Sequence, residues 1–285
     1  MTIALRTIRW DGIKQRLVCF LCFVFALSPL SAFAQLTYST GAVRDYVPNG
    51  CSGPDLPLTI PEADNFRLWY SLAGYQNISR WENTDVWGSD FRDGANNDLE
   101  PQGGSALPRV YFYSGHGICQ NPPAATSGDF ITVCSPSGQP NTTNIGNSTR
   151  WGNDNLRFAF IDASCPMDLV SLMNQWGPVF QGLHVAVGHS GTSTSDTLDS
   201  ADRGSQFAAR TAALPGPFGL FFPKQSVGDA WMATGTIDIQ TGCCAVVTAA
   251  GETEADAINR RENEHIDSGW SNPVANWLAW RWICR

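Results

Sequence analysis

Two apolar segments of the chain each end in a side chain that can take part in covalent catalysis. The first, VYFYSGHG, carries His116 between two glycines, and the second, LRFAFIDASC, ends in Cys165. An imidazole next to a thiol favours the thiolate, which is the nucleophile of cysteine hydrolases. Sites of this kind are built at the carboxyl ends of strands in open α/β sheets. We therefore expect both segments to be core strands that bring His116 and Cys165 together.

The elements that must position this pair can be traced from the pattern of apolar residues. Runs rich in β-branched and aromatic residues predict strands at 109–113, 156–163, 182–188 and 243–249. Apolar residues at helical spacing predict helices at 63–75, 166–176 and 204–213, and the start of another near 227. Because strands and helices alternate, the sequence predicts an α/β fold with a mainly parallel sheet.

The helix predicted directly after Cys165 bears on the reactivity of the thiol. Pro166 suits the first position of a helix, and Asp168 complements the positive end of the helix dipole. A cysteine at a helix N-terminus feels the same dipole, which lowers the pKa of its thiol. The sequence therefore predicts an activated Cys165.

The first residues of the chain have the pattern of an export signal. A basic start is followed by an apolar stretch at 17–30 and by the small-x-small motif Ser31-Ala-Phe-Ala34. We expect residues 1–34 to be a signal peptide, and the mature chain to be secreted or periplasmic with no membrane association. Residues 35–285 should then form a single domain, with a polar, cysteine-containing insertion at about 118–150 and a C-terminal extension at about 250–285.

Composition limits the partners of the mature chain. The net charge of the whole chain is −8, and it becomes more negative without the basic signal. A surface of this sign repels phosphate backbones, so we expect no nucleic acid partner. Eleven tryptophans and 15 phenylalanines with 15% charged residues predict a well-filled core.

Cysteine number points to a free thiol in an oxidising compartment. Of the nine cysteines, Cys19 and Cys22 belong to the signal, and an odd number remains. An odd number implies at least one free thiol or a bridge between molecules. We assign the free thiol to Cys165, because it ends a core strand in a catalytic setting.

The other cysteines are expected to form disulfides. Cys119 and Cys134 bracket the predicted insertion and would make a reasonable pair. The remaining four can form two more bridges in which Cys243 and Cys244 pair with Cys51 and Cys284.

The His and Cys blocks resemble those of the caspase-like cysteine peptidase superfamily, which includes caspases, metacaspases and gingipain- and clostripain-type enzymes. In caspases the His lies about 50 residues before the Cys, as it does here. A secreted bacterial branch of that fold is similar in the order of three segments, namely 87–91, the GHG block and 176–188. The resemblance implies a three-layer sandwich with a mainly parallel central sheet and loop insertions.

The resemblance also implies an activity and its residues. Cys165 would attack the carbonyl of a peptide or protein substrate, and His116 would act as general base and acid. Backbone N–H groups near Gly117 and Cys165 would form the oxyanion hole. Metacaspase-like enzymes carry Asp-x-Cys, so the same offset from Asp162 falls on Ser164, which is an alternative nucleophile. In metacaspases this Asp contributes to a pocket for Arg or Lys, which makes Asp162 a candidate S1 residue.

Two other functions fit the sequence. The segment HVAVGHSGT resembles the nucleophile elbow of a serine α/β-hydrolase, with Ser190 as nucleophile and His265 as the late histidine of the triad. The final glycine of that motif is replaced by Thr192, and the residues that follow make a poor helix start. The second alternative is a catalytically inactive caspase-fold protein that binds a peptide or another partner at the same strand ends.

The remaining polar candidates have simpler interpretations. Asp90, Asp93 and Asp98 offer oxygen ligands for calcium, although their spacing is not that of an EF-hand and turn formation is the simpler interpretation. We expect no other metal and no cofactor. His184 lies within an apolar strand and is interpreted as a core histidine. The others, interpreted as loop or surface residues, are His189, His265, Asp196, Asp199 and Asp202.

Overall fold

The computed structural model of the protein describes residues 36–50, 53–92, 108–119, 130–132, 142–146, 149–193, 198–212, 223–237, 242–268 and 274–285. All of them belong to one unit, Leu36–Arg285. The predicted signal at 1–34 lies outside the described residues. Within the described ranges, no helix is long and apolar enough to cross a membrane.

A seven-stranded mixed sheet forms the centre of the fold, with the strand order β10-β9-β8-β7-β3-β1-β2. The strands are β1 (Thr37–Ala42), β2 (Gln76–Glu82), β3 (Val110–Ser114), β7 (Phe158–Asp162), β8 (Val185–Ser190), β9 (Cys244–Gly251) and β10 (Trp277–Cys284). Five neighbouring strands run parallel to one another, in the order β8-β7-β3-β1-β2. The other two, β9 and β10, are antiparallel to their neighbours. The prediction of an α/β fold with a mainly parallel sheet is confirmed.

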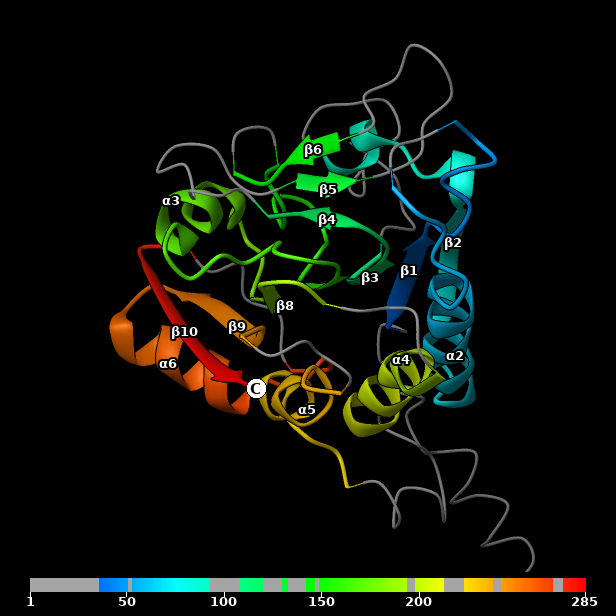
Figure 1. The fold of residues 1–285 in the computed structure, drawn as a ribbon. Helices are drawn as coiled ribbons and strands as arrows, with labels where there is room; N and C mark the ends of the chain where they lie inside the picture. The colour runs from blue at the N-terminus through cyan, green and yellow to red at the C-terminus, as the bar shows by residue number, and fades with distance from the viewer. Residues whose placement is uncertain are drawn as a thin grey trace, which may run out of the picture. The chain divides into compact units, whose positions relative to one another are not determined.

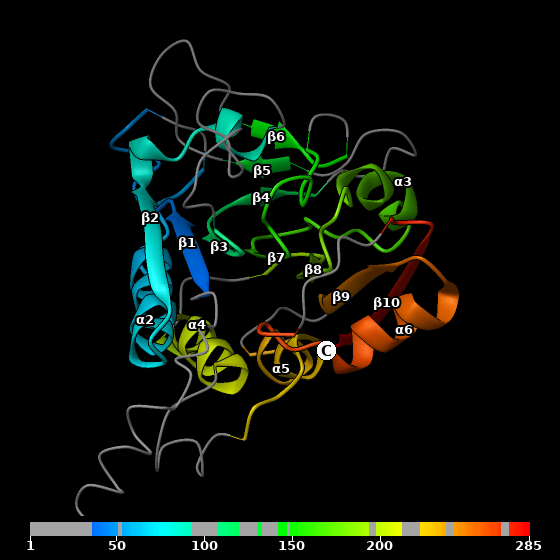
Figure 2. The ribbon, with the colours of Figure 1, turned by 180° about the vertical axis from the view of Figure 1, so that it is seen from behind.

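Helices cover both faces of this sheet (Figures 1 and 2). The face that carries most of them packs against α2 (Thr59–Leu72), α4 (Leu198–Thr211), α5 (Val227–Thr234) and α6 (Glu254–Asn263). The opposite face is covered by α3 (Leu172–Trp176) and irregular segments, with the short 3₁₀ helices η1 (Asn83–Asp85), η2 (Gly88–Phe91) and η3 (Gly177–Val179).

Successive side chains of the central strands pack into two different hydrophobic clusters, one on each face of the sheet. In β3, Val110 and Phe112 belong to the core on the α2 and α4 side, whereas Tyr111 and Tyr113 belong to the core on the α3 side. Because successive side chains of a strand point to opposite faces, a strand with both faces buried is apolar throughout. This is why β7 and β8 are apolar until their carboxyl ends, and why β3 is aliphatic or aromatic until Ser114.

A small antiparallel sheet lies within the segment predicted as an insertion. It consists of β4 (Gly117–Ile118), β5 (Phe130–Thr132) and β6 (Thr142–Asn144), in that order. Its first strand begins directly after His116, so the chain leaves the His loop as part of a hairpin.

The helix predicted to begin at Pro166 begins instead at Leu172. Asp168 accepts hydrogen bonds from the backbone N–H and the hydroxyl of Ser171, which holds the preceding residues in turns. The carbonyl of Pro166 accepts the indole N–H of Trp176 at 2.8 Å. Cys165 is therefore not at a helix N-terminus, and the predicted dipole effect on its thiol is wrong.

Candidate functional site

The two strand ends that the sequence singled out lie side by side. β3 and β7 pair in parallel with Ser114 opposite Asp162, and the N–H of Gly115 donates to the Asp162 carbonyl at 3.1 Å. Beyond the strands the contact continues, because a methyl group on Gly117 would overlap the backbone carbonyl of Ser164. The prediction that these strand ends meet is confirmed.

Cys165 is bound to Cys119 in a disulfide that joins the two loops. The predictions that Cys165 is the free thiol and that Cys119 pairs with Cys134 are therefore wrong. The reason is the hairpin, whose first strand β4 carries Cys119 back over the Cys165 loop. Cys134 lies outside the described residues.

A second disulfide joins Cys244 and Cys284, which was one of the pairings left open by the sequence. Cys51, the other partner considered, lies outside the described residues. The free cysteine of the described part of the chain is Cys243, and it is buried. Burial raises the pKa of its thiol to about 11, so it is protonated at neutral pH.

The backbone of Cys165 is held in an unusual conformation. Its φ angle is +58°, in the left-handed region that residues with a Cβ rarely adopt. Its N–H donates to the carbonyl of Gly191 at 3.0 Å, and the side chain is almost fully buried. This N–H is therefore not available to an oxyanion, which corrects the expectation for Cys165. Gly117, the other residue expected to supply an N–H, pairs with Ile131 within the small sheet.

His116 packs against the residues that precede α2. Its Nε2 lies 2.8 Å from the carbonyl oxygen of Pro54, so this nitrogen carries the proton and donates it. The ring contacts that of Tyr46 at a tilt, with 4.5 Å between centroids, and the Tyr46 hydroxyl accepts the backbone N–H of His116. Nδ1 is then the nitrogen left to act as a base.

Ser164, the alternative nucleophile, connects two loops. Its hydroxyl donates to the carbonyl of Ser193 and accepts the N–H of the same residue, both at 3.1 Å. These two bonds tie the loop after β7 to the loop after β8. The hydroxyl is thus used for structure and has no base beside it among the described residues.

Ser190 and His265 are not brought together, as the triad of the α/β-hydrolase hypothesis would require. Ser190 ends β8, and its hydroxyl accepts the N–H of Leu169 at 3.4 Å. His265 follows Glu264 in the chain. Glu264 pairs with the buried His184, which lies directly before the first residue of β8. Six residues of extended strand separate His184 from Ser190, which is about 20 Å at 3.3 Å per residue. His184 itself is a buried, paired histidine, as expected.

Asp162 lies beneath the strand ends, in a fully buried charged cluster, and not in an open pocket. Arg203 of α4 places its Nε 2.8 Å from the Asp162 carboxylate and 3.6 Å from that of Glu62 on α2. The assignment of Asp162 to an S1 pocket is corrected on this point, because its charge is already met by Arg203. Both side chains are 0% exposed.

The same cluster reaches up to the loops. Ser114 at the end of β3 donates its hydroxyl to Glu62 at 2.6 Å. Arg203 donates to the hydroxyl of Ser193 at 2.9 Å, and Ser193 is the residue held by Ser164. A continuous chain of hydrogen bonds and ion pairs therefore runs from the buried carboxyls to the residue before Cys165.

Burial and pairing set the protonation states of the cluster. Burial, together with the negative charge of Asp162, raises the pKa of Glu62 well above its ordinary value. Burial opposes ionisation of Asp162 too, but Arg203 and hydrogen bonds from His189 and Glu62 outweigh it, and the pKa of Asp162 is lowered. The two pKa shifts have opposite directions, so the neutral form is favoured for Glu62 and the ionised form for Asp162, which lies beside the Arg203 guanidinium.

His189 belongs to this cluster, and its interpretation as a loop or surface residue is wrong. It lies within β8, it is fully buried, and its Nε2 is 3.2 Å from Asp162. Its ring packs on that of Trp231, with centroids 5.1 Å apart. Burial and the charge of Arg203 lower the pKa of His189, against the opposite effect of Asp162, so the ring is neutral.

The sequence contains a signal for this cluster that its motifs did not reveal. Three central strands carry a polar side chain at or next to their carboxyl end, on one pleat face and after apolar residues at alternate positions: Ser114, Asp162 and His189. Glu62 and Arg203 come from two helices that pack closely. A methyl group on Gly204 would overlap the backbone of Glu62, so glycine allows this approach. Arg203 itself follows Asp199 and Asp202, which lie in α4 and not in a loop.

A comparison with family models gives one match, described as "Domain of unknown function (DUF6345)", over residues 42–282. The chain belongs to the DUF6345 family. No curated protein matches the chain.

Of the three residues considered for calcium, Asp90 is described in this DUF6345 domain, and it has a structural role. Asp90 is buried in η2, and its carboxylate accepts the backbone N–H of Trp87 at 2.7 Å. Asp93, Asp98 and Asp196 lie outside the described residues. Within the described ranges, no three His, Cys, Asp or Glu side chains gather in a way that could hold a metal ion.

The matched region of the DUF6345 domain includes the segments that carry His116 and Cys165, and it includes the buried cluster. In its disulfide form the site can anchor two loops, and it presents no thiol at Cys165. Cleavage of this one disulfide would place a thiol at the carboxyl end of β7, next to the loop that holds His116.

Proposed function

We propose that this DUF6345 domain is an exported caspase-like cysteine peptidase that is held latent by the Cys119–Cys165 disulfide. Cys165 is the nucleophile and His116 is the general base and acid. The observation that carries the proposal is the position of the disulfide, which links the loop after His116 to the loop after β7. The sulfur of Cys165 is therefore bonded to the segment that begins directly after His116.

The conformation of Cys165 supports this role. A φ of +58° in a residue with a Cβ costs free energy, and such residues are concentrated at functional sites. The turn is held by the bond from the Cys165 N–H to Gly191 and by the bonds between Ser164 and Ser193. The buried cluster below stabilises the same loops through Arg203.

Activation requires a dithiol reductant. A thiolate of the dithiol attacks the sulfur of Cys119, which belongs to an exposed residue, whereas Cys165 is buried. The S–S bond breaks and Cys165 leaves as a thiolate. The second thiol of the reductant then displaces Cys119 from the mixed disulfide. Two electrons and two protons pass to the protein, and the reductant becomes a disulfide.

The reduced site would carry out acyl transfer. The Cys165 thiolate attacks the carbonyl carbon of the substrate, and the C–N bond breaks as protonated His116 donates a proton to the leaving amine. Water, deprotonated by His116, then hydrolyses the thioester and restores the thiolate. Because the Cys165 N–H is bound to Gly191, the oxyanion must be met by other donors in the loops around Gly117.

A second function is a disulfide-locked binding domain with no catalytic activity. The commitment of the Cys165 N–H and the Nε2–H of His116 to backbone carbonyls favours it, because both groups are then structural. In this case the disulfide would hold the two loops as a rigid recognition surface.

The variant Cys119→Ser tests the proposal without a reductant, because it frees Cys165 and leaves the Cys244–Cys284 disulfide intact. We expect iodoacetamide to label Cys165, located by peptide mass mapping, and a peptide library to be cleaved. Cys119→Ser/His116→Ala should fold but react with iodoacetamide more slowly, because the thiolate loses its base. Cys119→Ser/His265→Ala is the matched control, and it should react at the rate of Cys119→Ser.

Three outcomes separate the candidates. Equal alkylation rates with and without His116 would contradict the dyad. Labelling of Cys165 with no cleavage of any library peptide would favour the binding domain. Cleavage that persists in Cys119→Ser/Cys165→Ala would exclude Cys165 as the nucleophile.

A further inference from the structure

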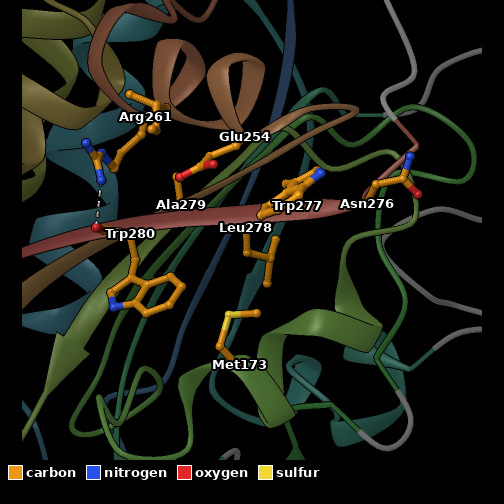
Figure 3. Close-up of a pocket in the computed structure, with 9 residues that line it drawn as sticks. Met173, Glu254, Arg261, Asn276, Trp277, Leu278, Ala279 and Trp280 are labelled. Atoms are coloured by element: carbon orange, nitrogen blue, oxygen red, sulfur yellow. Dashed lines mark hydrogen bonds between the residues drawn. The ribbon is translucent and has the colours of Figure 1, made fainter.

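The outer edge of the sheet is formed by β10, and a pocket of about 540 Å³ lies along it. The residues lining this pocket, here called the β10 groove, are Met173, Glu254, Ile258, Arg261, Asn276, Trp277, Leu278, Ala279 and Trp280. Figure 3 shows β10 running between α6, which carries Glu254 and Arg261, and α3, which carries Met173. Three strands separate this edge from β3 and its His loop.

The backbone of β10 faces this groove with open hydrogen-bonding groups. Arg285 exchanges backbone hydrogen bonds with the two residues before β9, through the Cys243 carbonyl and the Gly242 N–H. Because inward and outward groups alternate along a strand, Leu278, Trp280 and Trp282 direct their N–H and C=O groups at the free edge. Arg261 donates to the outward carbonyl of Trp280 at 2.9 Å, which agrees with this parity. Among the described residues, none forms a hydrogen bond with the outward N–H or C=O groups of Leu278 and Trp282.

The edge lacks the charges that usually protect an exposed strand. Arg281 is the one charged residue within β10, and its guanidinium is held by Asp229 and Glu262 at 2.7 and 2.6 Å. Trp277 and Trp282 are 50% and 51% exposed. Further exposed apolar side chains lie on β10 and beside it: Met173, Ile258, Val274 and Ile283. A long apolar edge of this kind marks a surface that a partner covers.

Charge indicates what kind of partner fits. Glu254 lines the groove in the first turn of α6, and Glu252 lies just before it. Within the described residues neither carboxylate forms an ion pair, whereas Arg261 is neutralised by Glu262. The chain as a whole carries a net charge of −8. The α6 side of the groove therefore attracts a cation, while the α3 side is apolar, with Met173 and Leu278.

We propose that the β10 groove binds an extended peptide that adds to the sheet as a further strand beside β10. The peptide backbone pairs with the outward groups of Leu278 and the N–H of Trp280. Side chains of a strand alternate, so one set lies on the apolar α3 side and the other on the Glu254 side. The fitting sequence alternates apolar and basic residues. This binding site is separate from the proposed catalytic pair and does not depend on it.

Peptide chemistry tests the proposal on the unmodified protein. The probe is a fluorescein-labelled decapeptide of alternating valine and lysine, titrated by fluorescence anisotropy. Saturable binding is expected, and the valine–glutamate counterpart should bind far more weakly. A version N-methylated at the amides of one edge should lose about tenfold in affinity, because each lost backbone hydrogen bond weakens pairing.

Variants of the groove locate the site. Glu254→Lys should weaken binding of the valine–lysine peptide about fivefold, as expected for reversal of an exposed charge. Trp277→Ser should weaken it about tenfold, because an aromatic anchor is lost. The matched controls are Asp154→Lys, at an exposed acid in the loop before β7, and Leu68→Ser, at an exposed apolar position of α2. Neither should change the affinity.

Four results would overturn the proposal. They are the absence of saturable binding, equal binding of the N-methylated peptide, equal binding by Glu254→Lys and Trp277→Ser, and a dimer in sedimentation that Trp277→Ser dissociates. The last result would mean that a second copy of the chain covers the edge.

Discussion

The guanidinium of Arg203 lies 2.8 Å from the carboxylate of Asp162, the residue for which the caspase resemblance implies a pocket for a substrate's basic side chain. An arginine of the chain's own helix α4 thus stands where a substrate arginine would be expected. Because both side chains are fully buried, the pair is part of the core beneath the strand ends. If the domain is a peptidase, we therefore expect its preference for the residue before the cleaved bond to be set elsewhere.

Removing the guanidinium should strongly destabilise the fold. Arg203→Met leaves the Asp162 carboxylate buried without its counter-ion, which typically costs about 3–5 kcal/mol. Urea denaturation followed by tryptophan fluorescence would measure the loss in the free energy of unfolding. Arg210→Met, at a half-buried position of the same helix, is the control and should cost much less. The double variant Asp162→Asn/Arg203→Met should lose less than the sum of the single losses, because no unpaired charge remains. Additive losses would show that the two side chains do not act as a pair.

Glu62 should make stability fall as pH rises. Its pKa is raised in the folded protein, so its protonated form stabilises the fold fully below its ordinary pKa of 4.5. Above that pH the unfolded chain releases the proton and the folded protein keeps it. Stability then falls with a slope of up to about 1.4 kcal/mol per pH unit. Glu62→Gln, a neutral mimic of the acid, lacks this effect. The free energy of unfolding of the parent should fall relative to that of Glu62→Gln between pH 5 and 7. The exposed Glu254→Gln is the control, and a constant difference between Glu62→Gln and the parent would mean that Glu62 is ionised.

Elements that a local sequence pattern determines were predictable, whereas those that distant contacts determine were not. The strand that ends at Ser114 and the strand that ends at Asp162 were predictable, because a strand with both faces buried is an unbroken apolar run. Their adjacency was expected because each ends in a reactive side chain, and sites are built where neighbouring strands of an open α/β sheet end. β2 was missed, since its residues are polar or half-buried at the sheet edge and its pattern resembles a loop.

The chemistry at the strand ends depends on contacts that no local pattern records. Cys119 reaches Cys165 because the hairpin that starts at Gly117 folds back, and the sequence does not fix that path. Arg203 is buried because α4 packs on α2, although acidic residues before it suggested a solvated loop. The helix expected after Cys165 begins later, because Asp168 caps a turn at Ser171 and not the first helical turn.

Cys243 should be inert in the native protein. It is buried, and burial raises the pKa of its thiol to about 11, so little thiolate forms at neutral pH. Iodoacetamide at pH 8 should leave Cys243 unlabelled until the protein is unfolded in guanidinium, as read by mass mapping. Rapid labelling of the native parent at this residue would contradict its burial. Labelling of the native parent at Cys165 would contradict the Cys119–Cys165 disulfide.

Replacement of the Cys119–Cys165 disulfide should separate the cross-link from the strain at Cys165. The bridge closes a loop with a sequence separation of 46, for which chain entropy predicts a loss of about 4 kcal/mol when it is removed. Cys119→Ala/Cys165→Ala should show this loss in urea denaturation. Cys119→Ala/Cys165→Gly should be more stable than the alanine pair by about 1 kcal/mol, because glycine adopts a φ of +58° without the penalty that a Cβ brings. At an ordinary position the same change to glycine would lower stability, through the greater freedom of the unfolded chain. A glycine pair less stable than the alanine pair would therefore show that the loop leaves the left-handed conformation once the disulfide is gone, and that the disulfide itself imposes the conformation of Cys165.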